Sequence, residues 1–242
     1  MSVPNGKQSV KIGEDGTPQP GLSPPPIRRY RKILFSFLLV SAIGTFAFLT
    51  FLVETIPSFA IDLQITRAIQ SIHFPSFDWL MRLISWPGFS PQSIIISLLI
   101  GFLFFVSGLR WESVTSLLAS LLSGVTNELV KGLIQRPRPS VDLVDVFQIL
   151  SSYSFPSGHV MFYTTLFGFV WYVIYTLLKR SWMRSLLLSL LGIFILLVGI
   201  SRIYLGQHWA SDVLGAYLLG GCLLGGKLLL YEGGKQGRFL HR

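Results

Sequence analysis

Six stretches of the chain are apolar over about the length that a helix needs to cross a bilayer, which is roughly 20 residues. They lie at about residues 32–54, 91–109, 113–130, 159–178, 184–200 and 212–231. The third stretch is interrupted by Ser, Thr, Asn127 and Glu128. Such an interruption is typical of a helix whose polar face is turned towards neighbouring helices. The pattern predicts an all-α integral membrane protein with six transmembrane helices.

The two ends of the chain differ from this pattern. Residues 1–27 are rich in Gly, Pro, Ser and Gln and have almost nothing to bury, so we expect a disordered tail. The basic run RRYRK before the first apolar stretch resembles the start of a signal peptide. The stretch is too long for one, however, and no small-residue cleavage site follows it. We therefore expect residues 28–232 to form one membrane domain, followed by a cytoplasmic tail at 233–242.

Composition agrees with a membrane protein. Of the 242 residues, 51% are hydrophobic and 13% are charged, whereas soluble domains carry about 25% charged residues. The net charge of +9 is a feature of many nucleic-acid-binding proteins. Here the basic residues flank apolar segments, which suits lipid head groups and topology, and we expect no nucleic-acid partner. The single cysteine, Cys222, excludes an intrachain disulfide.

The distribution of basic residues predicts the orientation, because Lys and Arg collect on the cytoplasmic side of a membrane. With both termini in the cytoplasm, fourteen of the twenty basic residues lie on that side. The other six are Arg67, Arg82, Lys131, Arg136, Arg138 and Arg202. Basic residues that oppose the topological preference need a reason, and an anionic ligand on the outer side is one.

The segment between the first two apolar stretches, residues 55–90, is long and contains HFPSFDWLMRLISWPG. Its mixture of aromatic and apolar residues predicts a short helix at the membrane interface. Trp79 and Trp86 are of the residue type that collects at that depth.

Three short polar clusters fall at the ends of apolar stretches on the outer side. KGLIQRPRP covers residues 131–139, PSGH covers residues 156–159, and SRIYLGQHWASD covers residues 201–212. Each alone has a simpler interpretation, such as an interfacial histidine anchor, a helix stop at Arg-Pro, or a structural His–Asp hydrogen bond. Their occurrence together, on one side and with complementary chemistry, favours a single functional site.

Five residues of these clusters are suited to holding an anion. Lys131, Arg138 and Arg202 supply cations, and guanidinium groups pair with phosphate oxygens through two parallel hydrogen bonds. Ser157 and the Gly158 amide come immediately before a helix, where free N–H groups and the helix dipole favour an anion. The clusters therefore predict a phosphate site.

The remaining residues of the clusters are suited to catalysis. His159 and His208 titrate near neutral pH and are candidates for an acid, a base or a nucleophile. If a helix begins near His208, Asp212 lies on the same face, accepts one imidazole N–H and leaves the other nitrogen free to attack. Asp212 is the only acid within the clusters, and Asp142 and Asp145 lie in the loop between the first two. These carboxylates are too few for a metal site, so the pattern predicts metal-independent phosphoryl transfer.

The clusters resemble the three-part signature of the type-2 phosphatidic acid phosphatase superfamily: Lys, six residues, Arg-Pro; Pro-Ser-Gly-His; and Ser-Arg, five residues, His, three residues, Asp. The resemblance covers about residues 30–232. Six residues after Lys131 the chain has Arg138-Pro139, so Arg138 takes the family position and Arg136 is left without a role. We therefore expect Arg136→Ala to cost much less activity than Arg138→Ala.

The resemblance implies a helical-bundle core of the phosphatase and haloperoxidase type, together with a role for each matched residue. His208 would be the nucleophile that forms a phosphohistidine, and Asp212 would orient it. His159 would protonate the leaving group and then activate water. The phosphate would be held by Lys131, Arg138, Ser157, Gly158 and Arg202. The family needs no metal, which implies that no cofactor is required.

The leading interpretation is therefore a membrane lipid phosphatase or diphosphatase. It would act on phosphatidic acid, phosphatidylglycerophosphate or polyprenyl diphosphate. A lipid phosphotransferase using the same intermediate and a non-catalytic lipid-binding or transport protein are the alternatives. The related haloperoxidases are soluble, and six apolar spans argue against them. The compact size suits a bacterial inner or plasma membrane with the site facing the periplasm, and an organelle lumen agrees equally with the topology.

Overall fold

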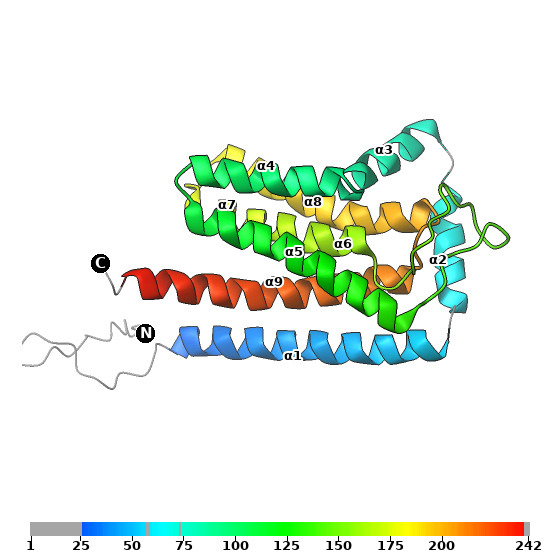
Figure 1. The fold of residues 1–242 in the computed structure, drawn as a ribbon, viewed down its shortest axis with the longest axis horizontal. Coiled ribbons are helices and arrows are strands. Elements are labelled where there is room, and N and C mark those ends of the chain that lie inside the picture. The colour runs from blue at the N-terminus through cyan, green and yellow to red at the C-terminus, as the bar shows by residue number, and fades with distance from the viewer. Residues whose placement is uncertain (1–25, 57–58, 73, 240–242) are drawn as a thin grey trace, which may run out of the picture. The chain divides into compact units, whose positions relative to one another are not determined.

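The computed structural model describes residues 26–56, 59–72 and 74–239, and its regular elements in this part of the chain are all helices (Figure 1). They are α1 (Pro26–Thr55), α2 (Ala60–Gln70), α3 (Pro75–Ser85), the 3₁₀ helix η1 (Trp86–Gly88), α4 (Gln92–Val106), α5 (Arg110–Ile134), α6 (Gly158–Phe162), the π-helix η2 (Tyr163–Phe167), α7 (Gly168–Leu177), α8 (Trp182–Tyr204) and α9 (Ala210–Phe239). The all-α fold predicted from the sequence is confirmed.

The chain forms two compact units, residues 1–38 and 39–242, whose boundary lies within α1. The tail predicted at residues 1–27 lies outside the described residues except for its last two, which begin α1. Helix α9 continues to Phe239, so the described part of the segment predicted as a C-terminal tail is helical. The fold of residues 39–242 carries the polar clusters and is described below.

Five helices are long and apolar enough to cross a membrane, namely Ile33–Thr55, Arg110–Ile134, Gly158–Leu177, Trp182–Tyr204 and Ala210–Gly234. A sixth crossing arises if Pro75–Gly88 and Gln92–Val106, which meet at a bend of 64°, are taken as one broken span. The predicted second span is therefore found only if the short helix α4 is counted together with the bent α3–η1 segment. Multiple apolar spans establish an integral membrane protein.

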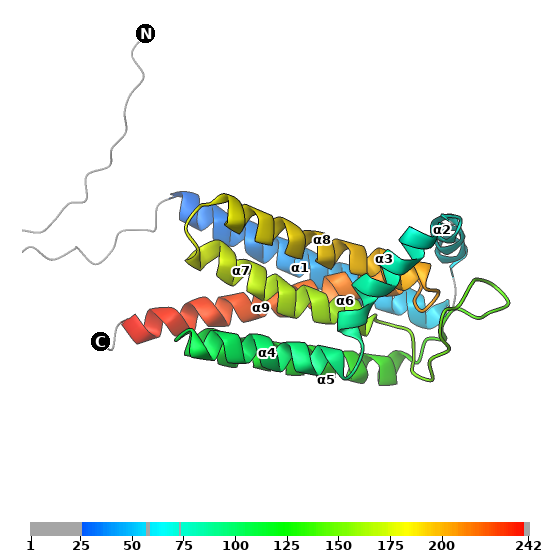
Figure 2. The same ribbon diagram turned by 90° about the horizontal axis from the view of Figure 1, so that it is seen from above.

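The span formed by α6, η2 and α7 lies at the centre of the bundle. Val160, Met161, Tyr163 and Leu166 are buried in it and pack with Val198 and Ile203 of α8 and with Val213 and Ala216 of α9. Figure 2 shows α4, α5, α7, α8 and α9 running along a common direction. Many apolar side chains on their outer faces are exposed, such as Leu98, Leu121 and Leu196. That exposure is expected where lipid is the surrounding solvent.

The segment between α5 and α6 is irregular and crosses one end of the bundle. Gln135 takes a left-handed conformation after the last turn of α5, and Pro137 follows, so the helix cannot continue. Gln70 of α2 donates to the carbonyl oxygens of Asp145 at 2.6 Å and Tyr204 at 2.8 Å. Helix α2 therefore ties this segment to the end of α8.

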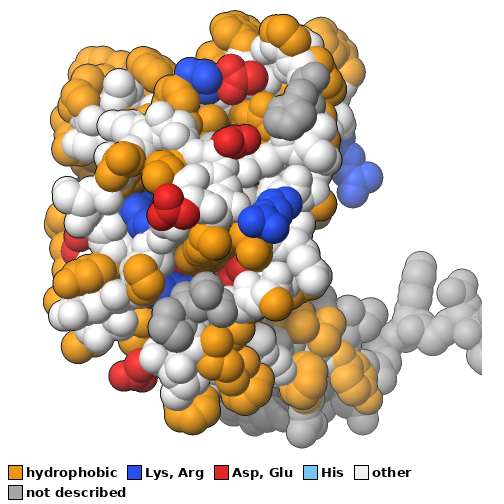
Figure 3. Space-filling view, turned by 90° about the vertical axis from the view of Figure 1, so that its right-hand side faces the viewer, with side chains coloured by type: hydrophobic (Ala, Val, Ile, Leu, Met, Phe, Trp, Pro, Cys, Tyr) orange, Lys and Arg blue, Asp and Glu red, His pale blue; other side chains and the backbone are white. Residues whose placement is uncertain are grey.

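Helix α3 buries one face and exposes the other. Met81 and Ile84 are buried in the core, whereas Trp79 is 64% exposed and Trp86, in η1, is 55% exposed. Helical structure predicted in residues 55–90 is thus present, as α2 and α3. This end of the bundle, seen face-on in Figure 3, exposes acidic and basic side chains among apolar ones. In α2, α3 and the segment between α5 and α6, the exposed charged side chains include Arg67, Asp142, Asp145 and the ion pair of Arg82 with Asp78.

The turn between α8 and α9 depends on one glycine. Gly206 has a φ of 63°, and a Cβ atom at this position would collide with the carbonyl oxygen of Asp145. The same turn is closed by hydrogen bonds from the N–H groups of Gln207 and His208 to the carbonyl oxygen of Arg202. A side chain at residue 206 would therefore disturb both the turn and the segment packed on it.

We expect Gly206→Ala to lower the melting temperature of the detergent-purified protein by about 5 °C or more. A left-handed conformation costs a non-glycine residue roughly 1–2 kcal/mol, and the collision with Asp145 adds to this cost. Thermal unfolding measures the effect. Gly221→Ala is the matched control, because a Cβ there meets nothing within 4 Å and Ala favours a helix. An unchanged melting temperature for Gly206→Ala would contradict this account of the turn.

Candidate active site

The three polar clusters meet at the end of the bundle where α5 ends and α6 and α9 begin. Six of the eight predicted site residues line one cavity of about 1260 Å³, namely Lys131, Arg138, Gly158, His159, Arg202 and His208. Of the other two, Ser157 directly precedes Gly158 and is buried, and Asp212 lies beside His208. Residues far apart in the chain thus form a single site.

His208 lies between charged groups on both sides of its ring. Its Nδ1 atom lies 3.6 Å from Asp212 Oδ2, and its Nε2 atom lies 3.2 Å from Arg138 Nη1. Because a guanidinium group donates hydrogen bonds and cannot accept them, Nε2 must be the acceptor in the second contact. The proton of the neutral ring is therefore on Nδ1, facing Asp212, and Nε2 carries the lone pair.

The surroundings of His208 also keep it uncharged. Burial lowers the pKa of His208 well below its usual value of 6.5, and the nearby cations Arg138, Arg202 and Lys131 lower it further. Both effects disfavour the protonated ring. At neutral pH the side chain consequently has a lone pair available for attack.

Asp212 is fully buried, and both of its carboxylate oxygens are occupied. Oδ1 accepts a hydrogen bond of 2.5 Å from Arg136 Nη1. Oδ2 accepts one from the Ser154 hydroxyl and one of 2.8 Å from the backbone N–H of Trp209. Since Asp212 is in the first turn of α9, the last bond also satisfies an N–H group at the start of that helix. These partners fix the carboxylate beside His208.

Arg136 takes part in this arrangement, which the sequence did not predict. Its side chain is completely buried, and it contacts Asp62 of α2 at 2.9 Å and Asp212 at 2.5 Å. The structure therefore directs Arg138 into the cavity and Arg136 away from it, towards two carboxylates. These contacts give Arg136 partners that the sequence did not indicate, and the expected order of the Arg136→Ala and Arg138→Ala variants stays a prediction. The predicted position of Arg136 on the outer side, against the usual topological preference, was the available signal.

Arg202 and Arg138 are held by neutral oxygen acceptors. The Arg202 side chain is buried, donates to the side chains of Ser85 and Gln207, and lies 5.2 Å from the centre of the Phe89 ring. Arg138 donates to the carbonyl oxygens of Ser152 and Gln207 and to the Ser152 hydroxyl. Because the acceptors are uncharged, these contacts orient the two guanidinium groups while leaving their positive charge unneutralised.

His159 is positioned by the segment that follows α3. Its ring stands edge-on to the Phe89 ring, with 4.5 Å between the ring centres. Gly88 packs against the same imidazole so closely that a Cβ atom at residue 88 would collide with it. Neither residue was assigned a function from the sequence, because only the bend after α3 brings this segment to the site.

Several buried donors at the site lack a partner in the described part of the chain. They include the Ser157 hydroxyl and Arg202 Nε, and the ring nitrogens His159 Nε2 and His208 Nδ1 also lack a hydrogen-bond partner there. Leaving a buried donor unsatisfied costs about 1–3 kcal/mol. Together with the charges of Lys131, Arg138 and Arg202, these atoms suit an anion with several oxygen acceptors. No group of three His, Cys, Asp or Glu side chains placed to hold a metal ion occurs among the described residues.

A bundle of apolar spans that carries a buried His–Asp pair beside three cations has the features of a membrane-embedded enzyme for an anionic group. The model of the PAP2 superfamily matches residues 112–232, which contain all three clusters. The chain belongs to this superfamily, as its motifs predict.

Similar proteins of known activity agree with this assignment. Phosphatidylglycerophosphatase B of Bacillus subtilis is 32% identical over 160 residues, which are 66% of this chain and 77% of that protein. The crystal structure of a transmembrane PAP2-type phosphatidylglycerolphosphate phosphatase from Bacillus subtilis matches with a TM-score of 0.71 at 28% identity. It covers 83% of this chain and 97% of that chain. The protein is an integral membrane lipid phosphatase.

A second solved structure shows the same fold at lower similarity. Aquifex aeolicus LpxE matches with a TM-score of 0.55 and 21% identity, covering 72% of this chain and 98% of that chain. The chain therefore shares its fold with a protein whose sequence is only distantly similar.

We expect Gly88→Ala to reduce the rate of phosphate release at saturating lipid substrate by roughly tenfold or more. The added methyl group displaces the His159 ring, and a shift of about 1 Å in a catalytic group has effects of this size. The assay uses the lipid phosphate that the wild type cleaves fastest. Gly192→Ala serves as control, because a Cβ there meets nothing within 4 Å. Equal rates for the two variants would show that Gly88 does not position His159.

Proposed function

We propose that the protein removes phosphate from a membrane lipid through a covalent phosphohistidine on His208, without a metal ion or another cofactor. The observation that carries the proposal is the orientation of His208 between Asp212 and Arg138. Its Nδ1–H faces the carboxylate, and its lone pair lies on the side of the cavity cations. This arrangement suits an attacking nitrogen whose developing positive charge is stabilised from behind.

In the first step the phosphate group is held by Lys131, Arg138 and Arg202, with the donors of Ser157 and Gly158. Nε2 of His208 attacks phosphorus, and the bond between phosphorus and the lipid oxygen breaks. His159 gives a proton to the departing oxygen. The negative charge of Asp212 stabilises the phosphorylated imidazolium.

In the second step His159 takes a proton from a water molecule, and the resulting hydroxide attacks phosphorus. The bond between phosphorus and Nε2 breaks, and inorganic phosphate leaves. His208 returns to its neutral form and His159 to its protonated form, so the cycle is balanced in atoms and charge. Positioning and electrostatic stabilisation supply the catalysis, as is usual for phosphoryl transfer.

The cavity supports a lipid as substrate. Away from the cations its walls are apolar side chains of α4 and α5, including Ile94, Leu98, Leu117, Leu121 and Val125. Cations at one end and hydrocarbon along the rest match a phosphate attached to an acyl chain. A small polar phosphate would leave most of this surface uncovered.

Among lipid phosphates we propose phosphatidylglycerophosphate as the preferred substrate. The Bacillus subtilis relative and the Bacillus subtilis crystal structure that resemble the chain carry names that give this activity. In addition, the Glu128 carboxylate lines the cavity 3.6 Å from Lys131 Nζ, and its side chain is 72% exposed. Its oxygens can accept a hydrogen bond from the free glycerol hydroxyl of phosphatidylglycerophosphate. Phosphatidic acid and polyprenyl diphosphate have no hydroxyl at this place. Those two lipids are the alternatives.

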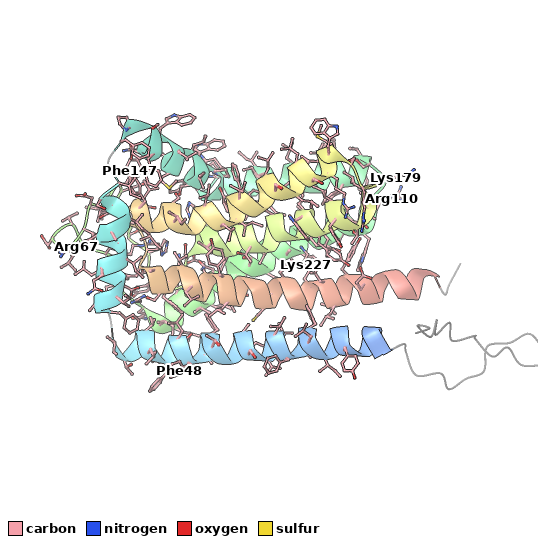
Figure 4. All side chains as sticks on the ribbon, turned by 180° about the vertical axis from the view of Figure 1, so that it is seen from behind. Phe48, Arg67, Arg110, Phe147, Lys179 and Lys227 are labelled. Carbon is pink, nitrogen blue, oxygen red and sulfur yellow. The ribbon has the colours of Figure 1, made fainter. Side chains whose placement is uncertain are left out.

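We further propose that both termini are cytoplasmic and that the site faces the outer side, periplasmic in a bacterial inner membrane. Figure 4 shows Arg67 and Phe147 at the end of the bundle that carries α2, and Arg110 and Lys179 at the opposite end. Arg180 and Arg184 also belong to that opposite end, in the turn between α7 and α8 and the first turn of α8. Arg67 and Arg82 lie at the end that carries the site, but more of the basic residues that are not part of the site gather at the opposite end, which supports a cytoplasmic location for that end.

The direct test is phosphate release by the detergent-purified protein from a panel of the three lipids, with EDTA present. We expect EDTA-resistant release, fastest from phosphatidylglycerophosphate, and none from His208→Ala. Radiolabelled lipid phosphate should label the wild type at His208 after rapid acid-free denaturation. Release that persists in His208→Ala would exclude this residue as the nucleophile. Label that moves to another lipid instead of to water would identify a phosphotransferase.

The low pKa of His208 predicts the pH dependence of this activity. The reactive form is neutral, and a pKa well below 6.5 keeps the ring neutral as the pH falls through 6.5. We therefore measure kcat/KM between about pH 4.5 and about pH 8. The apparent pKa at which kcat/KM falls on the acid side should be below 6.5. A limb centred at or above 6.5 would contradict the assigned electrostatics of the site.

A further inference from the structure

Helix α2 lies behind the site and contributes one acidic residue, Asp62, to a buried ion network. Figure 1 shows α2 crossing the end of the bundle beside the start of α9. Asp62 is 1% exposed, and it is the only acid between Glu54 and Asp78. A carboxylate is seldom buried so completely unless it is paired, and here two groups pair with it.

The contacts form a continuous chain from Asp62 to His208. Asp62 Oδ2 lies 2.9 Å from Arg136 Nη2, and Arg136 Nη1 lies 2.5 Å from Asp212 Oδ1. Asp62 also accepts hydrogen bonds from the backbone N–H of Ser211 at 2.8 Å and from its hydroxyl at 2.6 Å. Since Ser211 directly precedes Asp212, Asp62 holds the chain at the point where α9 presents Asp212 to His208.

The charges in this network alternate between negative, positive and negative, and all three side chains are buried. If Arg136 were paired with Asp212 alone, the two charges would cancel, and Asp212 would do little to stabilise a positive imidazole. Because Arg136 is shared with Asp62, the network keeps a net negative charge. The Asp212 oxygen nearest to His208 is the one that Arg136 does not contact. The network therefore fixes the carboxylate without removing its effect on the ring.

We propose that Asp62 and Arg136 are positioning residues that maintain the orientation and the negative charge of Asp212 behind the nucleophile. This inference rests on the proposed function, because it assigns the network a part in the attack by His208. The described residues that line the cavity do not include Asp62 or Arg136. Their loss should therefore slow the reaction of the bound lipid and leave its binding almost unchanged.

A purely structural role for the network predicts a different result. If the ion pairs only hold α2 against α9, their loss lowers the melting temperature while the activity of the folded protein stays normal. The split between kcat and KM, together with the reactivity of His208 itself, separates the two roles.

The first measurement compares the kinetics of Asp62→Asn, Arg136→Lys and Arg82→Gln. For Asp62→Asn we expect kcat to fall roughly ten- to a hundredfold, the range typical of groups that orient a functional ligand. KM should change by less than about twofold, because no phosphate contact is lost. Arg136→Lys keeps the charge but cannot bridge two carboxylates, so its kcat should also fall. Arg82→Gln is the control, since it breaks the exposed pair with Asp78 on the same end of the bundle.

The double variant Asp62→Asn/Arg136→Gln provides an internal check. Arg136→Gln alone leaves two buried carboxylates without their shared cation, and removing one partner of a buried ion pair is strongly destabilising. Removing the charge of Asp62 as well relieves part of that cost. The double variant should consequently be more stable, and lose less activity, than Arg136→Gln alone.

The second measurement is independent of turnover. Diethyl pyrocarbonate modifies neutral imidazole nitrogens, and mass spectrometry gives the rate at His208 and at His159 separately. Asp62→Asn should slow the modification of His208 severalfold relative to the wild type and leave that of His159 unchanged. If Asp62→Asn does not fold, Arg136→Lys carries the same test.

The outcomes separate this inference from the proposed function. Unchanged reactivity of His208 and unchanged kcat in the folded variants would overturn the positioning role. If the wild type releases no phosphate from any lipid, but Asp62→Asn still slows the modification of His208, the positioning role stands and the proposed hydrolysis fails. A raised KM at normal kcat would also overturn the inference, because it would place the network in lipid binding.

Discussion

The buried carboxylate of Asp212 is the interaction on which the site depends. It accepts hydrogen bonds from Arg136, from Ser154 and from the backbone before α9, and it faces His208. Through these contacts one side chain joins the segment between α5 and α6 to the start of α9, and Arg136 extends the connection to α2. A buried charge is tolerated only where it is paired and hydrogen-bonded. The same contacts that satisfy this requirement also orient the histidine.

The cationic side of the site is built on the opposite principle. Lys131, Arg138 and Arg202 repel one another, and two of them are held by carbonyl, hydroxyl and amide oxygens instead of by carboxylates. The charge of Arg138 and Arg202 is thus directed at the cavity and is not cancelled by these contacts. The repulsion between these cations is overcome when the protein folds. Little reorganisation is therefore needed when a phosphate group binds. Aromatic contact of Phe89 with both Arg202 and His159 keeps the arrangement compact.

The sequence predicted the apolar spans and the residues of the three clusters, because span length and motif spacing are properties of the chain itself. Spacing also assigned the family's phosphate-binding position to Arg138 instead of Arg136, which stays a prediction; in the structure Arg138 Nη1 lies 3.2 Å from His208 Nε2. The direction of the Arg136 side chain could not be predicted from the sequence, because its partners Asp62 and Asp212 are 74 and 76 residues away along the chain. The packing of Gly88 on His159 depends likewise on the bend after α3. The residues that form the π-helix η2 after His159 show no sequence pattern that predicts it.

The apolar wall of the cavity has a kinetic consequence. Leu98 and Leu121 line the cavity and are more than half exposed on the bundle surface, where the acyl chains of the membrane lie. If the protein acts as proposed, the phosphate of a substrate lipid reaches the cations while its acyl tail stays among the acyl chains of the membrane. Turnover would then follow the mole fraction of the phosphorylated lipid in the bilayer instead of its bulk concentration. Diluting that lipid with an inert one would slow the enzyme as effectively as removing substrate from a soluble enzyme's solution.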